Sequence, residues 1–161
     1  MKELLLIVLV AILLPVAASA NEIGFRDLII GMDKTAMVAN SKEKLVECRG
    51  NVCEYESEIK ATSVKVLCYI NNDKLYFIKI EFDPSNYQEI KGAMKEKWGN
   101  PEKVSHEKAT NLFGVSVVSE NLSWKIPSGL VTLKQFDSMT KGRALIAGHD
   151  FVVKENSGKG F

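Results

Sequence analysis

The stretch Thr62–Phe82, TSVKVLCYINNDKLYFIKIEF, decides the fold class of this chain. Apolar and polar residues alternate over Thr62–Ile70 and again over Lys74–Phe82, which is the period of a half-buried strand. Between these runs lies Asn71-Asn72-Asp73, which is rich in residues that tolerate left-handed backbone, so an antiparallel hairpin is predicted. Its apolar face is expected to carry Val64, Val66, Cys68, Ile70, Tyr76, Ile78, Ile80 and Phe82.

The segment that follows, SNYQEIKGAMKEKWGNP (residues 85–101), has the spacing of an amphipathic helix. Its apolar residues are Tyr87, Ile90, Met94 and Trp98. Ser85 and Gln88 have the spacing of a capping box, and Gly99 can take the left-handed conformation that ends a helix. We predict that this helix packs on the sheet that contains the hairpin, and that Gly92 allows a close approach between the two.

The remaining elements are less regular. Asp33 is predicted to cap a helix that runs to about Leu45. Further strands are expected over Glu102–Ala109, Asn121–Ile126, Leu130–Phe136 and Arg143–Ala147. Residues 111–119 fit either a strand or a packed loop. Runs of strands favour an α+β fold with two helices packed on a mainly antiparallel sheet, and the two halves of the chain share a helix-plus-strands outline.

The N-terminus, MKELLLIVLVAILLPVAASA, predicts a signal peptide over residues 1–20. Its apolar run from Leu4 to Leu14 is shorter than the ~20 residues of a membrane span. We therefore expect cleavage after Ala20, a periplasmic or secreted protein, and no membrane-spanning segment after cleavage. Residues 21–153 are expected to form one domain, and the polar, Gly-rich residues 154–161 a flexible tail. The net charge of +1 without a basic block excludes nucleic acid as an expected partner.

The pattern GMDKTAMV (31–38), then a cysteine pair, a hairpin and a helix ending in KWGNPEKV (97–104), resembles small secreted bacterial domains. The architecture is similar to the β-lactamase-inhibitor-protein-like fold, which the BamE-type outer-membrane-assembly lipoproteins share. Those lipoproteins carry a lipid-attachment cysteine after the signal peptide, whereas this chain has Asn21 there. The resemblance implies a binding module rather than a catalyst.

The cysteines lie in VECRGNVCEY (46–55) and at Cys68. The spacing Cys-x4-Cys around Gly50-Asn51 is that of a hairpin, whereas thioredoxin-type redox sites need Cys-x-x-Cys. In such a hairpin Cys48 and Cys53 face each other within disulfide range. We predict this disulfide, with Cys68 as a buried thiol; a bridge from Cys68 to either of the others is the alternative.

Motifs for catalysis or for a cofactor are absent from the sequence. His106 and His149 have no nucleophile motif near them, and the other cysteine and histidine ligands that zinc would need are scattered. Glu54, Glu56 and Glu58 are expected to share one face of a strand, as a solvated edge or, in the alternative, as a weak cation site. We predict a protein-binding or inhibitor-type module without cofactor or metal, with another envelope or extracellular protein as partner. The alternative is a small periplasmic hydrolase or thiol enzyme that uses His106 or His149.

Overall fold

The computed structural model describes residues 22–110 and 114–148. The predicted signal peptide, the predicted tail and His149 lie outside these residues. The chain begins with a small hairpin of β1 (Gly24–Phe25) and β2 (Leu28–Ile29). The first half then comprises α1 (Lys34–Asn40), β3 (Lys44–Arg49), β4 (Val52–Ile59), β5 (Thr62–Asn71) and β6 (Lys74–Phe82). The second half comprises α2 (Tyr87–Trp98), β7 (Lys103–Thr110), β8 (Ser116–Ile126), β9 (Gly129–Ser138) and β10 (Lys141–Gly148).

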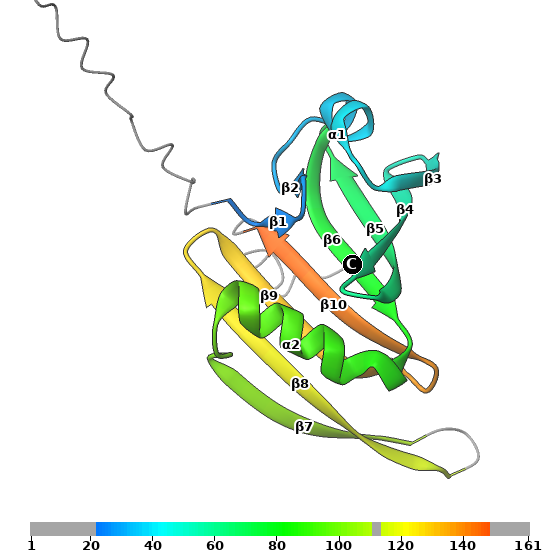
Figure 1. Ribbon diagram of the computed structural model, residues 1–161, viewed down its shortest axis with the longest axis vertical. Coiled ribbons are helices and arrows are strands. Elements are labelled where there is room, and N and C mark those ends of the chain that lie inside the picture. Colours follow the sequence, from blue (N-terminus) through cyan, green and yellow to red (C-terminus); the bar gives the residue numbers. More distant parts are fainter. Residues whose placement is uncertain (1–21, 111–113, 149–161) are drawn as a thin grey trace, which may run out of the picture.

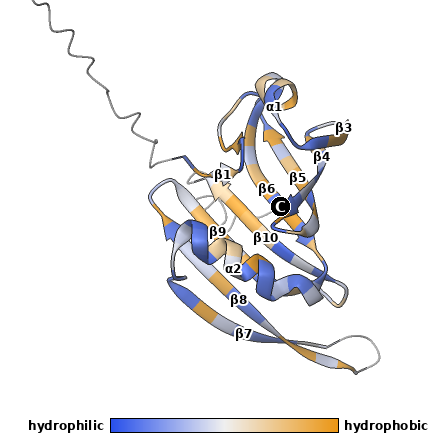
Figure 2. Cartoon of the chain, viewed as in Figure 1, coloured by the Kyte–Doolittle hydropathy of each residue, from blue (hydrophilic) through white to orange (hydrophobic). Residues whose placement is uncertain are grey.

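Eight strands form one curved antiparallel sheet in the order β3-β4-β5-β6-β10-β9-β8-β7 (Figure 1). Each half is a helix followed by four strands that pair in sequence order, and the last strands of the two halves, β6 and β10, pair with each other. The predicted α+β class with an antiparallel sheet is therefore confirmed. Hydrophilic and hydrophobic residues alternate along the strands, as a sheet with one buried face requires (Figure 2).

The sheet dominates the fold, and the two helices are unequal. Helix α2 lies across the sheet, where Tyr87, Ile90 and Met94 are buried. Helix α1 has seven residues and buries only Met37. It ends at Asn40 rather than near Leu45, because the following residues are extended and pair with β4. The prediction of two helices packed on a sheet is thus correct in class but overstates α1.

The β5–β6 hairpin is confirmed, with one correction. Asn72 and Asp73 form its turn at φ values of 50° and 59°, the left-handed conformation that Asn and Asp tolerate. Val64, Val66, Cys68 and Ile70 are buried as predicted. In β6, however, the register shifts so that Tyr69 faces Phe77 while Ile70 faces Leu75. Tyr76 is the extra residue of this bulge and is half-buried, and Leu75 takes the core position in its place.

The start of α2 differs from the predicted capping box. A 3-10 turn over Pro84–Asn86 precedes α2, and its N-cap is Asp83 rather than Ser85, because proline is preorganised for the first helical position. The Asp83 carboxylate accepts hydrogen bonds from the Ser85 backbone N–H at 2.8 Å and from its hydroxyl at 2.7 Å. Gly92 does not allow a close approach, since nothing beyond its neighbours in α2 lies within 4 Å of where its Cβ would stand.

The second half follows the predicted strands within a few residues. For residues 111–119 a strand and a packed loop were both predicted as possible. Residues 111–113 lie outside the described part of the chain, and β8 begins at Ser116. Under the C-terminal end of α2, Trp124 is only 2% exposed, and its Nε1 donates a hydrogen bond to the Gly99 carbonyl at 2.9 Å. Trp98 is partly buried, with its ring centroid 6.4 Å from that of Trp124.

Candidate functional site

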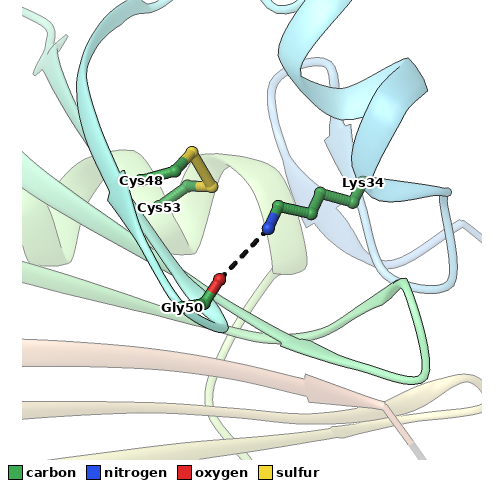
Figure 3. Close-up of a disulfide and its surroundings, with 4 residues drawn as sticks. All are labelled: Lys34, Cys48, Gly50 and Cys53. Atoms are coloured by element: carbon green, nitrogen blue, oxygen red, sulfur yellow. Dashed lines mark hydrogen bonds between the residues drawn. A yellow bond between two sulfur atoms is a disulfide. The ribbon is translucent and has the colours of Figure 1, made fainter.

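The predicted disulfide joins Cys48 and Cys53 at the tip of the β3–β4 hairpin (Figure 3). The two residues face each other across the hairpin with a Cα–Cα distance of 4.0 Å. Gly50 in the turn has a φ of 57°, which favours glycine. The Lys34 Nζ donates a hydrogen bond to the Gly50 carbonyl at 3.1 Å, so α1 holds the hairpin tip. The bridge is therefore a local structural tie.

Cys68 is a free thiol inside the core, as predicted. It lies on β5 directly opposite Cys53, so the three cysteines form one row across three strands. Burial raises the pKa of the Cys68 thiol to about 12. At neutral pH the thiol is therefore protonated, which is the unreactive form.

The other residues singled out in the sequence do not assemble into a site. His106 is exposed on β7, opposite Glu120, and four strands separate β7 from Cys68 on β5. Glu54, Glu56 and Glu58 do share one face of β4. Their strand is not an edge, however, because β4 pairs with both β3 and β5. Among residues 22–110 and 114–148, no group of three His, Cys, Asp or Glu side chains could hold a metal ion.

The strongest candidate for a site is the face of the sheet opposite α2, which we call the open face. Its residues are the alternate strand positions that the core does not use, and no described helix covers them. Half-buried apolar side chains lie near its middle: Leu67 on β5, Tyr69 stacked on Phe77 with centroids 4.1 Å apart, and Leu145 on β10. An exposed sheet face with aromatic residues is suited to contact with another protein.

A polar row crosses the open face, with one residue from each of the eight strands. In spatial order these residues are Lys44, Glu56, Lys65, Glu81, Arg143, Lys134, Asn121 and Ser105. Several of them pair with acids or bases beside the row, as Lys65 does with Glu54 and Lys134 with Glu107. Partial burial raises the pKa of Glu81, but Lys79 and Lys141 outweigh it and hold that pKa below its usual value.

A groove of about 330 Å³ lies on the open face, across β7 to β10. Three cations line it, Lys103, Lys134 and Arg143, together with one carboxylate, Glu107. Hydroxyl groups, the Asn121 amide and leucine side chains complete the lining. The groove therefore has an excess of positive charge and many hydrogen-bond donors.

This groove was not predicted from the sequence. Lys103, Asn121, Lys134 and Arg143 come from four strands, and only the register between those strands brings them together. A signal was present, since Lys134 and Arg143 occupy strand positions that alternate with buried apolar residues. Without the strand order, however, nothing indicated that these positions are neighbours.

Comparisons of the chain with protein families, with curated proteins and with solved structures give no match. The resemblance to the β-lactamase-inhibitor-protein-like fold therefore stays a prediction. In the part of the chain that the structure describes, neither helix is long and apolar enough to cross a membrane.

Proposed function

We propose that this chain is an exported protein-binding or inhibitor-type module whose partner, another envelope or extracellular protein, docks on the open face. The observation that carries this proposal is the open face itself, a broad sheet surface with a half-buried apolar centre, a polar row and a groove. Such a surface offers both an apolar core for contact and polar groups that fix the orientation of a partner.

Export is supported by two independent features. The first 20 residues have the pattern of a signal peptide, and the Cys48–Cys53 disulfide is typical of proteins in oxidising compartments.

The alternative, a hydrolase or thiol enzyme that uses His106 or His149, has weaker support. A thiol enzyme needs a thiolate with a base within hydrogen-bonding reach. Cys68 is instead a buried thiol, and His106 lies on a strand at the far end of the same sheet.

Photo-crosslinking in the producing cell tests the proposal. A photoreactive phenylalanine analogue at Tyr69, on the open face, should give an adduct with one defined protein. The same analogue at Lys95, on the exposed side of α2, is the matched control and should give none. Absence of an adduct at Tyr69, or equal adducts at both positions, would overturn the proposal.

A further inference from the structure

The alternation of charge along the polar row ends at the groove. From Lys44 to Arg143 its charges alternate in sign from strand to strand. On the next strand Lys134 lies directly opposite Arg143, so two cations face each other. Like charges in this arrangement destabilise a sheet. An anion that contacts both side chains would remove that repulsion.

The next residue in the row offers a hydrogen-bond donor. The Asn121 side chain is 9% exposed, and its Oδ1 accepts a hydrogen bond from the Ser119 hydroxyl at 3.1 Å. Nδ2 lies close enough to the Glu107 carboxylate to help lower its pKa, but it makes no hydrogen bond of normal geometry to any described residue. This buried donor is therefore poorly satisfied, and an acceptor placed closer to Nδ2 would relieve its desolvation cost.

Arg143 offers a second such donor. Its guanidinium reaches the Asp137 carboxylate through one terminal nitrogen, at 3.3 Å, while Nε is buried without a partner among the described residues. Because Nε and the remaining terminal nitrogen lie on one edge of the guanidinium, that edge matches the two oxygens of a carboxylate.

The groove already holds one carboxylate, which belongs to the protein. Glu107 lies 3.3 Å from the Lys134 Nζ, and Lys134, followed by the nearby Asn121 amide, lowers the pKa of Glu107. The Glu107 side chain is 61% exposed and stands on β7, the edge strand. It can therefore turn outward with little loss of packing and leave its donors to another acid.

We propose that the groove binds a carboxylate from an acidic segment of the partner protein, which replaces Glu107 against Lys134, Asn121 and Arg143. A carboxylate is the expected ligand, because it takes the place of the Glu107 carboxylate against Lys134, while Asp137 still offsets part of the charge of Arg143. This inference names the chemistry of the partner and so rests on the proposed function.

The test measures binding of hexaglutamate, blocked at both ends, to the mature chain with its disulfide formed. Isothermal titration gives the Kd, and amide NMR follows the Asn121 side-chain NH₂ and the Arg143 Nε–H directly. Blocked hexaglutamine is the uncharged control peptide, and inorganic phosphate is the competing anion. The variants are Lys134→Gln, Glu107→Gln and, as a matched cation on the far side of the molecule, Lys95→Gln.

The two groove variants should act in opposite directions. Lys134→Gln should weaken hexaglutamate binding by about tenfold, the loss expected for one charge-assisted hydrogen bond. Glu107→Gln removes the competing carboxylate and should strengthen binding, by about threefold for an exposed ion pair. Lys95→Gln should leave the Kd unchanged, and the Asn121 and Arg143 signals should shift on binding.

Three results would overturn the proposal: no binding of hexaglutamate, equal losses in Lys134→Gln and Lys95→Gln, or displacement of the peptide by phosphate at equal concentration. These results are distinct from a failure of the proposed function. If the photoreactive analogue at Tyr69 still crosslinks one defined protein while hexaglutamate does not bind, the carboxylate proposal fails and the proposed function stands.

Discussion

Glu120 on β8 joins the sheet to α2 through two partners. Its carboxylate lies 2.6 Å from the Lys91 Nζ and accepts a hydrogen bond from the Tyr87 hydroxyl at 2.7 Å. The ion pair with Lys91 lowers the pKa of Glu120, and the hydrogen bond from Tyr87 lowers it further. Partial burial acts in the opposite direction but is outweighed. In the folded protein this pKa is therefore below the value of about 4.3 expected for an unfolded chain.

A lowered carboxylate pKa means that the folded state gains stability only while Glu120 is ionised. This gain is complete above the unfolded pKa and is lost as the pH falls through the folded pKa. The loss in free energy of unfolding caused by Glu120→Gln should be about 1–3 kcal/mol at pH 7 and should shrink below about pH 4. Urea unfolding at pH 7, 5 and 3.5 measures it, with the exposed Glu58→Gln as control. A difference that does not change with pH would contradict this account.

At the scale of the element, one glycine inside α2 and one directly after it should respond in opposite ways to the same substitution. Gly99 follows the helix at a φ of 76°, where a side chain is strained. Gly92 lies inside the helix with open space around its Cβ position. Gly99→Ala should therefore lower the free energy of unfolding by about 1 kcal/mol, and Gly92→Ala should raise it by about 0.5–1 kcal/mol. Thermal and urea unfolding of both variants test the pair; a stability loss in Gly92→Ala would show that a neighbouring element packs against the helix at Gly92.

Trp98, the last residue of α2, and Trp124, which lies beneath it on β8, should differ in the same kind of experiment. Trp124 is fully buried, so Trp124→Ala should lower the free energy of unfolding by about 3–5 kcal/mol. Trp98 is only partly buried, so Trp98→Ala should lower it clearly less. If Trp124→Ala does not fold, Trp124→Phe keeps an aromatic ring and loses the hydrogen bond to Gly99, at a cost of about 1–3 kcal/mol. Urea unfolding followed by circular dichroism measures all three variants. A larger loss of stability in Trp98→Ala than in Trp124→Ala would show that Trp98 is the more deeply packed ring.

The sequence predicted elements well wherever one local pattern dominates. The alternation in β5 and the helical spacing of Tyr87, Ile90 and Met94 identified buried faces correctly. Predictions failed where a distant contact decides the local conformation. Pairing with β4 ends α1 early, and a bulge set by the facing strand moves Tyr76 out of the core.

At the scale of the whole molecule, the order of the strands was the missing information. The sequence predicted the strands of each half but not that β6 and β10 join the halves. That pairing places Glu81 beside Arg143 and completes the polar row. The disulfide was predictable because it spans only five positions, whereas the groove was not, because its residues come from four strands.

Removal of the disulfide tests whether the fold depends on it. The bridge closes a very short loop, so the double variant Cys48→Ala/Cys53→Ala, which places no hydroxyl at the buried Cys53 position, should lose only about 2 kcal/mol of stability. The chain should still unfold in one cooperative transition, since the buried core lies mainly elsewhere. Differential scanning calorimetry measures both properties. Complete loss of the folded state would show that the bridge holds more than the hairpin tip.

The row of three cysteines also determines how the protein becomes oxidised. Cys48 is exposed, whereas Cys53 and Cys68 are buried behind it, in that order across the strands. We expect a disulfide oxidant arriving from solvent to react at Cys48 first, which forms a mixed disulfide and releases one thiol of the oxidant. Attack of Cys53 on the Cys48 sulfur then closes the bridge and releases the second thiol. Cys68 faces Cys53 and lies one strand further from Cys48, so the register of the strands favours the Cys48–Cys53 pairing.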